Sequence, residues 1–268
     1  MLKIFAATTT ISPWGVVATA GLVSITLFTS WRLDLGLIPS ISISSIRSVI
    51  QLLVAGVLLV PALEPDANLA WSWVWCGAMV VFATGLVRRR TANLGPRRPS
   101  ILLSLLAVST PVVAGLVIVF CFGVLPLKPS TLVPVTGIVL GNTLPATSAG
   151  AARFVELILE ERGQIEAMLA LGFRPRASIR PQVKKAVQLA LIPPIERMRM
   201  IGLVLLPGTM TGMLLAGVEP FQAVMTQMVV SFLILSGVTL TVTTIVLGCA
   251  FSALSGGRIS STAETGPL

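Results

Sequence analysis

Apolar runs long enough to cross a bilayer recur along this chain, separated by short polar stretches. The pattern predicts about seven spanning helices, at about 12–31, 37–60, 70–87, 100–124, 130–150, 195–217 and 221–250. The first run contains Ala18–Ala20, a candidate signal-peptide cleavage sequence, but its continuation to Trp31 favours a retained spanning helix. We therefore expect an all-α, polytopic membrane protein in which residues 1–268 form a single transmembrane domain.

One segment, about 151–185, breaks this pattern with 11 charged residues in 35 positions. Helical spacing predicts an amphipathic surface helix, because one stripe is mostly apolar or small and the other face is polar. The stripe contains Phe154, Ile158, Glu161, Ile165, Met168 and Gly172. Gly172 suits the left-handed position just past a helix end, and Phe173 can supply the hydrophobic contact of such a cap.

The chain after Gly172 is expected to form a second short helix, and "LIPPIE" (Leu191–Glu196) is expected to break the chain before the sixth span. Two interpretations of 151–185 remain open. It is either a membrane-surface connector between two spans or a docking element that lies in the groove of a cytoplasmic partner.

Charge supports the membrane class and suggests an orientation. Only 11% of residues are charged and 54% are hydrophobic, whereas soluble domains carry about 25% charged residues. The loop "RRRTANLGPRR" holds five Arg, but "PALEPDANL" holds two acids and no base. The positive-inside rule then places the N-terminus outside and the C-terminus in the cytoplasm of the cell membrane. The same rule explains the net charge of +9 without a nucleic-acid partner.

The composition excludes several kinds of chemistry. There is no His, and Cys76, Cys121 and Cys249 lie in separate apolar segments without a C-x-x-C pair, so neither a zinc site nor a disulfide framework is expected. No metal-binding residues can be assigned, and the methionines fit packing better than a soft-metal path. The chain also lacks a P-loop. We expect no cofactor on this chain, and ATP and Mg²⁺ would have to bind a separate subunit.

Polar and helix-breaking residues inside the spans are candidates for a translocation pathway or gate. They are Arg47 and Gln51 on one face of the second span, Asn142 and Pro145 in the fifth, and Pro207, Thr209 and Thr211 in the sixth. Arg47 could instead extend to the lipid headgroups. The pairs Gly137–Gly141 and Gly208–Gly212 have the small-xxx-small spacing of closely packed helices, so we expect them to pack.

Four stretches resemble known permeases. "EAMLALG" (Glu166–Gly172) resembles the Glu-Ala-Ala-x-x-x-Gly signature of ABC-transporter permeases, with Met168 in place of the second Ala. "IRSVIQLLVAG" (Ile46–Gly56), "LGNTLPATS" (Leu140–Ser148) and "GLVLLPGTMTGMLLAG" (Gly202–Gly217) resemble motifs of the Fet-type iron-export permease family, which includes the plant aluminium-sensitivity permeases.

The resemblance implies the membrane subunit of an ABC transporter, a homodimer on two separate ATPase subunits. Segment 151–185 would then be the cytoplasmic coupling segment, contacting the ATPase through Phe154, Ile158, Glu166, Ala167, Gly172 and Phe173. The implied cargo is iron or another metal species, and a metal chelate or sugar nucleotide is an alternative. A self-sufficient secondary transporter or channel, and a scaffold that binds a cytoplasmic partner, also remain open.

Overall fold

The computed structural model describes residues 13–63, 68–91 and 100–255, and every regular element in these ranges is an α-helix. The all-α fold class is therefore confirmed. The helices are α1 (Pro13–Arg32), α2 (Ile38–Leu63), α3 (Leu69–Arg90), α4 (Ile101–Cys121), α5 (Pro129–Glu160), α6 (Arg162–Ala170), α7 (Pro175–Ser178), α8 (Arg180–Met200), α9 (Gly208–Leu215) and α10 (Pro220–Ser255).

Five helices of the described chain are long and apolar enough to span a membrane: α2, α3, α4, α5 and α10. They correspond to the spans expected at 37–60, 70–87, 100–124, 130–150 and 221–250. The first expected span coincides with α1, which is not among these five. The chain is therefore a polytopic helical membrane protein.

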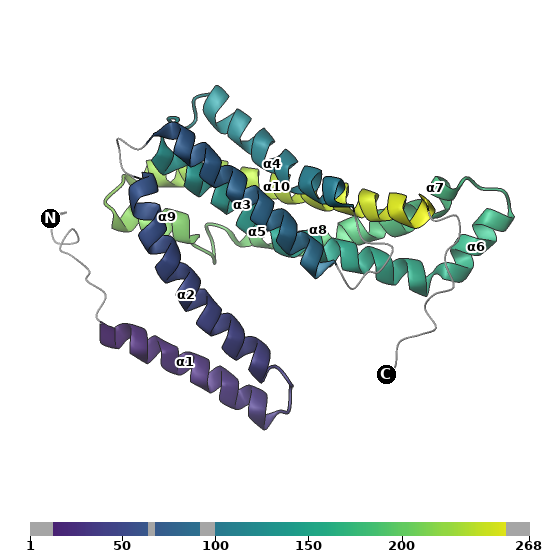
Figure 1. Ribbon diagram of the computed structural model, residues 1–268, viewed down its shortest axis with the longest axis horizontal. Coiled ribbons are helices and arrows are strands. Elements are labelled where there is room, and N and C mark those ends of the chain that lie inside the picture. The colour runs from purple at the N-terminus through teal and green to yellow at the C-terminus, as the bar shows by residue number, and fades with distance from the viewer. Residues whose placement is uncertain (1–12, 64–67, 92–99, 256–268) are drawn as a thin grey trace.

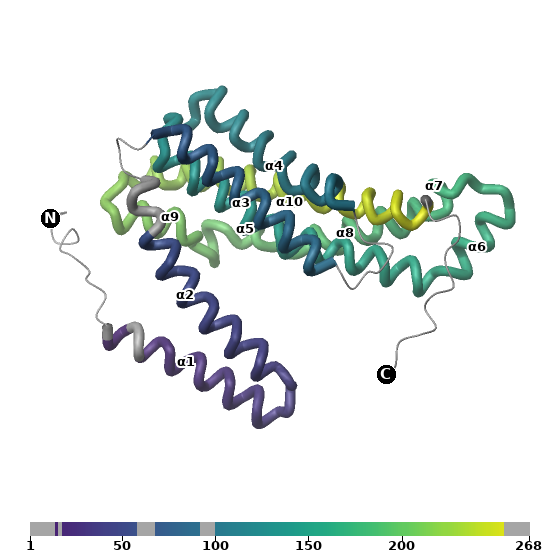
Figure 2. The backbone as a smooth tube through the Cα atoms, viewed as in Figure 1, coloured from purple at the N-terminus to yellow at the C-terminus, as the bar shows by residue number. Residues whose placement is uncertain are grey.

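The helices form an elongated bundle in which α3, α4, α5, α8 and α10 lie lengthwise together (Figure 1). Helices α3, α5 and α10 run toward the end that carries α6 and α7, and α4 and α8 run the opposite way (Figure 1). Helices α1 and α2 form a hairpin that diverges from the bundle (Figure 2). Of the charged residues that suggested an orientation, Glu64, Asp66, Arg97 and Arg98 lie outside the described residues.

The core lies between α5 and α10, with α4 and α8 packed against both. Its largest fully buried side chains include Phe154, Leu157, Ile245 and Val242. Helix α10 approaches α5 and α8 closely at Gly150, where an added Cβ would lie 3.1 Å from Val242 Cγ1 and 3.3 Å from Ala190 Cβ. A larger residue would separate these three helices.

The glycines expected to pack helices together behave differently from one another. A Cβ at Gly137 would lie 3.3 Å from Met79 Cε, but nothing lies within 4 Å of a Cβ at Gly141, Gly208 or Gly212. Within this chain the latter three are therefore not close-packing positions. A small-xxx-small spacing identifies residues that permit close approach, but the fold decides whether another helix arrives there.

The expected span 195–217 is wrong as a single helix. Helix α8 passes through Pro193 and Pro194 and ends only at Met200, and α9 starts after a turn at 201–207. In this turn Gly202 has φ +86° and its N–H donates to Leu205 O at 3.0 Å. A proline removes one helical hydrogen bond, which packing of α8 against α5 and α10 can offset, whereas a left-handed glycine reverses the chain.

The separate amphipathic helix expected to start near Ala151 is also wrong, because α5 is continuous to Glu160. Its 32 residues are about 48 Å long, and a bilayer core is about 30 Å thick. About twelve residues of α5 therefore extend beyond the thickness of the bilayer core. The polar segment begins as an extension of a spanning helix and continues into α6.

Candidate functional site

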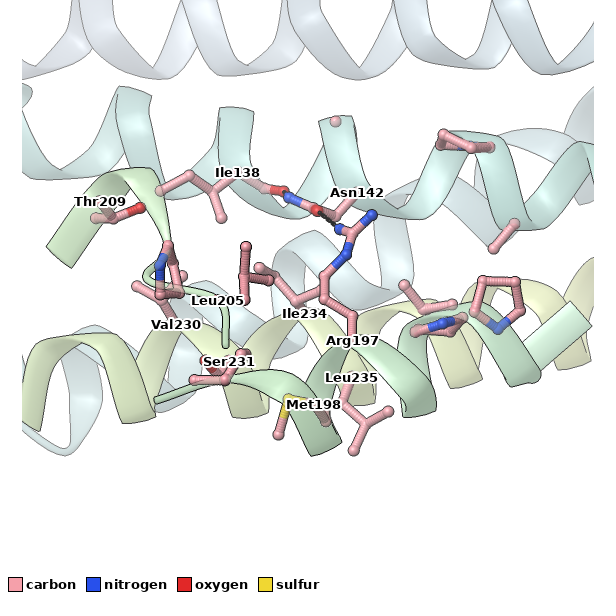
Figure 3. A pocket seen from close by; sticks show the side chains of 18 of the residues that line it. Ile138, Asn142, Arg197, Met198, Leu205, Thr209, Val230, Ser231, Ile234 and Leu235 are labelled. Carbon is pink, nitrogen blue, oxygen red and sulfur yellow. Dashed lines mark hydrogen bonds between the residues drawn. The ribbon is translucent and has the colours of Figure 1, made fainter. Parts of the chain in front are cut away.

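A cavity of about 720 Å³ lies between α5, α8, the start of α9 and α10 (Figure 3). This volume is in the range of small-molecule sites. Most of its wall is apolar, as at Ile138, Ile201 and Leu235, and the polar groups are few. They are Asn142 of α5, Arg197 of α8, Thr209 of α9, and Gln227 and Ser231 of α10.

Arg197 reaches across the cavity to Asn142 (Figure 3). Its Nη1 donates to Asn142 Oδ1 at 3.0 Å, while Asn142 Nδ2 donates to the carbonyl of Ile138 at 2.8 Å. No carboxylate of the described chain forms an ion pair with Arg197, and the neighbouring Glu196 is instead paired with Arg199 at 2.6 Å. The cavity wall therefore carries a positive charge that a neutral amide holds in place.

Gln227 of α10, another lining residue, has a buried acceptor without a partner. The residue is 5% exposed, its Nε2 donates to Ser231 Oγ at 3.0 Å, and its Oε1 has no hydrogen-bond partner. A buried acceptor without a donor is costly, and such groups are uncommon in folded proteins. Gln227 Oε1 is therefore a point at which a ligand or water could donate a hydrogen bond.

The third polar element is the N-terminus of α9. Pro207, Gly208 and Thr209 line the cavity, and the first intrahelical bond of α9 goes from Thr211 N–H to Pro207 O at 3.0 Å. The N–H groups at the start of a helix lack intrahelical acceptors and carry partial positive charge. The break between α8 and α9 thus places backbone donors at the cavity, as interrupted helices do in transporters.

The structure brings together only part of the predicted pathway. Asn142, Pro145, Pro207 and Thr209 line the cavity, and so do Gly141 and Gly208. Thr211 is absent from the lining, and its hydroxyl donates to Pro207 O at 3.2 Å.

Arg47 and Gln51 lie elsewhere, exposed on α2 and outside the cavity. The sequence interpretation missed Arg197, Gln227 and Ser231 as cavity residues. A Gln inside an otherwise apolar span was the signal that could have identified Gln227.

The predicted helix end at Gly172 is confirmed. Helix α6 ends in a Schellman motif: Gly172 has φ +86°, its N–H donates to Leu169 O at 3.0 Å, and Phe173 N–H donates to Met168 O at 3.1 Å. This end lies at one extremity of the molecule, at the turn between α6 and α7 (Figure 1).

The apolar stripe of the polar segment faces inward. Phe154, Ile158 and Ile165 are 0%, 2% and 0% exposed and belong to the chain's own core. The partner contacts expected of Phe154 and Ile158 therefore lack an accessible surface. The exposed residues at this end include Glu166, Ala167, Leu171, Gly172 and Phe173, with Leu171 and Phe173 77% and 51% exposed.

Glu161 ties this end to the bundle. Its carboxylate accepts from Lys185 Nζ and Gln182 Nε2, each at 2.9 Å, and so joins the α5–α6 junction to α8. The hydrogen bond from Lys185, followed by that from Gln182, keeps the pKa of Glu161 below its ordinary value. Arg176 of α7 adds a cation–π contact, 5.0 Å from the centroid of the Phe251 ring in α10. These contacts connect the α6–α7 end to α8 and α10, both of which line the cavity.

Metal ligands are not gathered anywhere in the described residues: no group of three or more His, Cys, Asp and Glu side chains could hold an ion.

Comparison with known proteins yields one family. A model of the uncharacterised protein family UPF0014 matches residues 13–253. The UPF0014 membrane protein YjkA of Bacillus subtilis (strain 168) is 29% identical over 219 residues, covering 82% of this chain and 86% of the relative. The "Probable iron export permease protein FetB" of Escherichia coli (strain K12) is 27% identical over 224 residues, covering 82% and 83%.

A plant relative, "Protein ALUMINUM SENSITIVE 3" of Arabidopsis thaliana, is 29% identical over 211 residues, covering 78% of this chain and 76% of its own. No solved structure matches. These matches confirm the resemblance to the Fet-type permeases and their plant relatives.

Proposed function

The chain belongs to the UPF0014 family of membrane proteins, and from this premise we propose that it is the permease subunit of an ABC transporter. The observation that carries the proposal is the capped α6–α7 end, which exposes Leu171 and Phe173 and is tied through Glu161 to α8. An exposed apolar tip beside a helix end can occupy a groove of another protein. The partner is a separate ATPase, which binds the ATP and Mg²⁺.

The proposed cargo is iron or another metal species, and the proposed direction is export. The support is the name of the Escherichia coli relative, a probable iron export permease. A non-metal cargo such as a sugar nucleotide is the alternative within the same mechanism.

The proposed cycle uses the connections described above. Closure of the ATPases on ATP displaces α6, and the Glu161–Lys185 pair passes the displacement to α8. Helix α8 ends at the turn 201–207, where Gly202 lets the chain bend. Movement of α8 against α5 and α10 then changes the access of the cavity from one side of the membrane to the other.

A homodimer is proposed because one spanning helix is unprotected in the single chain. The spanning window of α2 is 0% buried, yet it contains Arg47 and Gln51, one helical turn apart and both exposed. Placing an Arg against lipid at the bilayer centre costs about 2.5–3.5 kcal/mol or more. We infer that the α2 face of a second copy covers this face, with the N-termini outside and the C-termini cytoplasmic.

A transporter that works alone is the second candidate. Ion-coupled transporters use Asp or Glu side chains within the membrane. The residues that line the cavity include no carboxylate, which favours coupling to an ATPase instead.

The first test is a pull-down of the tagged full-length chain from its own membranes in mild detergent, with retained proteins identified by mass spectrometry. The expected result is a P-loop ATPase in a fixed ratio to the chain, lost when Gly172→Val distorts the exposed end. Recovery of the chain alone across several detergents would reject the ABC assignment in favour of the second candidate.

The dimer is tested by oxidative cross-linking in membranes of Gln51→Cys, with Val49→Cys on the opposite face of α2 as the matched control. Cross-linked dimers of the Gln51 variant alone are expected. Equal cross-linking of both variants would contradict the proposed interface.

A further inference from the structure

The unpaired charge on the cavity wall points to the chemistry of the cargo. We propose that the cavity binds a solute that presents an anionic oxygen group, a carboxylate or a phosphate, to Arg197, and a hydrogen-bond donor to Gln227. The inference rests on the proposed function in taking this cavity as the cargo site. The inference goes beyond that function because it assigns the charge of the cargo and the residues that bind the cargo.

Arg197 is exposed in the single chain, and none of the described carboxylates forms an ion pair with it. Asn142 is about 20 Å along α5 from Pro129, at 1.5 Å per residue, so Arg197 is bonded to the part of α5 that crosses the membrane. The Asn142 bond satisfies one of the five guanidinium N–H donors and supplies no negative charge. A guanidinium binds carboxylates and phosphates through paired N–H groups. The remaining donors of Arg197 suit an anionic group in the cavity.

The N–H groups at the start of α9 add hydrogen-bond donors with partial positive charge, the same sign as the charge of Arg197. Gly208 and Thr209 line the cavity, and nothing lies within 4 Å of the Cβ position of Gly208. Open space next to the free N–H groups of a helix N-terminus is where anions bind. The α9 terminus and Arg197 therefore favour the same kind of ligand group.

Gln227 is the independent observation that a ligand belongs here. Gln227 lines the cavity and is 5% exposed, and its Oε1 has no hydrogen-bond partner. An anionic oxygen would be repelled by this atom, whereas a hydroxyl or N–H group would satisfy it. The best ligand thus combines an anionic group with a donor, as hydroxy acids and sugar phosphates do.

A bare metal cation fits this wall poorly. The fixed positive charge of Arg197 repels it, and the lining residues contain no carboxylate to compensate. A metal cargo would enter as an anionic complex, in which the chelating acid presents its oxygens to Arg197. Free and metal-bound acids share this chemistry, so the experiment must separate them.

The test is equilibrium binding to the full-length chain in nanodiscs of neutral phosphatidylcholine, so that anionic lipid does not compete. The probes are citrate, ferric citrate, a nucleoside diphosphate sugar and ferrous chloride, each at the same ionic strength. We expect at least one anionic probe to bind and ferrous chloride alone not to bind. Comparing citrate with the nucleoside diphosphate sugar shows whether the site prefers a carboxylate or a phosphate. Comparing citrate with ferric citrate shows whether it prefers the free acid or its iron complex.

Arg197→Gln should weaken binding of the preferred anion by about tenfold to a hundredfold, and Arg197→Lys by less, because it keeps the charge. Arg199→Gln is the matched control, since Arg199 is on the same helix but pairs with Glu196 and does not line the cavity. If Arg197→Gln unfolds in the nanodisc, Asn142→Asp is used to neutralise the guanidinium instead.

The donor is tested with a ligand pair that differs only in a hydroxyl, citrate and tricarballylate. The wild type should prefer citrate, and Gln227→Leu should abolish the preference. Anion binding that is indifferent to Arg197, or binding of ferrous chloride alone that survives Arg197→Gln, would overturn the inference. Anion binding without stimulation of any associated ATPase would support the anion site and reject the ABC function. ATPase stimulation by ferrous chloride without anion binding would support the ABC function and reject the anion site.

Discussion

Arg197 and Asn142 are 55 residues apart in the chain, and one hydrogen bond of 3.0 Å joins them across the cavity. The bond fixes the last turn of α8 against the middle of α5. Because the acceptor is a neutral amide, the bond positions the guanidinium without neutralising it. Position and charge can therefore be changed separately.

Asn142→Asp keeps the shape of the acceptor and adds a negative charge. A charge-assisted bond to Arg197 should hold or raise the thermal stability of the chain while anion affinity falls about tenfold or more. Asn142→Leu is the counterpart: it removes the acceptor, so stability should fall by about 0.5–1.5 kcal/mol while Arg197 stays charged. Thermal unfolding and nanodisc binding measure the two effects. Undiminished anion affinity in the Asp variant would show that the charge of Arg197 does not contact the ligand.

Gly172→Val should abolish stimulation of the partner ATPase while the chain still inserts into the membrane. A β-branched residue at φ +86° is strained by about 1–2 kcal/mol, so the Schellman end of α6 would rearrange. Gly163→Val is the control, because Gly163 is within α6 and nothing lies within 4 Å of its Cβ position. ATPase rates in proteoliposomes and a carbonate-extraction assay provide the readouts. Equal ATPase rates for the two variants would remove Gly172 from the coupling surface.

Glu166→Lys should also uncouple the ATPase, with little change in stability. Its ion pair with Arg162, 2.7 Å between Nε and Oε1, is exposed, and such pairs contribute about 0–1 kcal/mol. Glu156→Lys breaks a similar exposed ion pair with Arg153, which lies before α6 in the last turns of α5, and should leave coupling intact. The comparison uses ATP hydrolysis and unfolding temperature for both variants. Loss of coupling in both would indicate a general charge effect instead of a contact at Glu166.

The Glu161–Lys185 connection predicts a pH dependence of stability. The pKa of Glu161 is lowered in the folded state, so its stabilising effect is complete above the ordinary pKa of a glutamate, about 4.3. The effect is lost as pH falls from there through the lowered pKa. Unfolding temperatures in detergent should therefore drop more steeply below that point in the wild type than in Glu161→Gln. Glu160→Gln, a neighbouring exposed carboxylate, should keep the wild-type slope. Identical slopes for wild type and Glu161→Gln would mean that Glu161 is not tied to α8.

Gly150→Ala should destabilise the bundle by about 1–3 kcal/mol, because the new methyl group would be too close to Ala190 and Val242. Gly141→Ala, nine residues earlier in the same helix, meets nothing within 4 Å and should be neutral or gain up to about 1 kcal/mol. Chemical unfolding in detergent distinguishes them. Equal stabilities would contradict the close approach of α5, α8 and α10 at Gly150.

The sequence predicts the spanning helices, one helix end and the family, because the signals for these features lie in short stretches of the chain. A long apolar run must form a helix in lipid, which is why α2, α3, α4, α5 and α10 match the expected spans. A glycine followed by an apolar residue after a helical pattern indicates the end of a helix. The structure has such an end at Gly172, whose φ is +86°. The family also follows from short motifs, and 13–253 matches it.

Only the tertiary structure decided where these elements meet. Pro193 and Pro194 have the local character of a helix break, yet α8, packed against α5 and α10, continues through them. It ends at Met200, where Ile201 is extended and Gly202 begins the turn. The stripe with Phe154 has the same periodicity whether it faces a partner or its own core, and packing buries it. The sequence marks Gln227 and the start of α9 as polar or broken positions in apolar segments, but it does not show that they lie beside Arg197. They form a site only because α8, α9 and α10 pack together with the more distant α5 around one cavity, and periodicity carries no information on which faces converge.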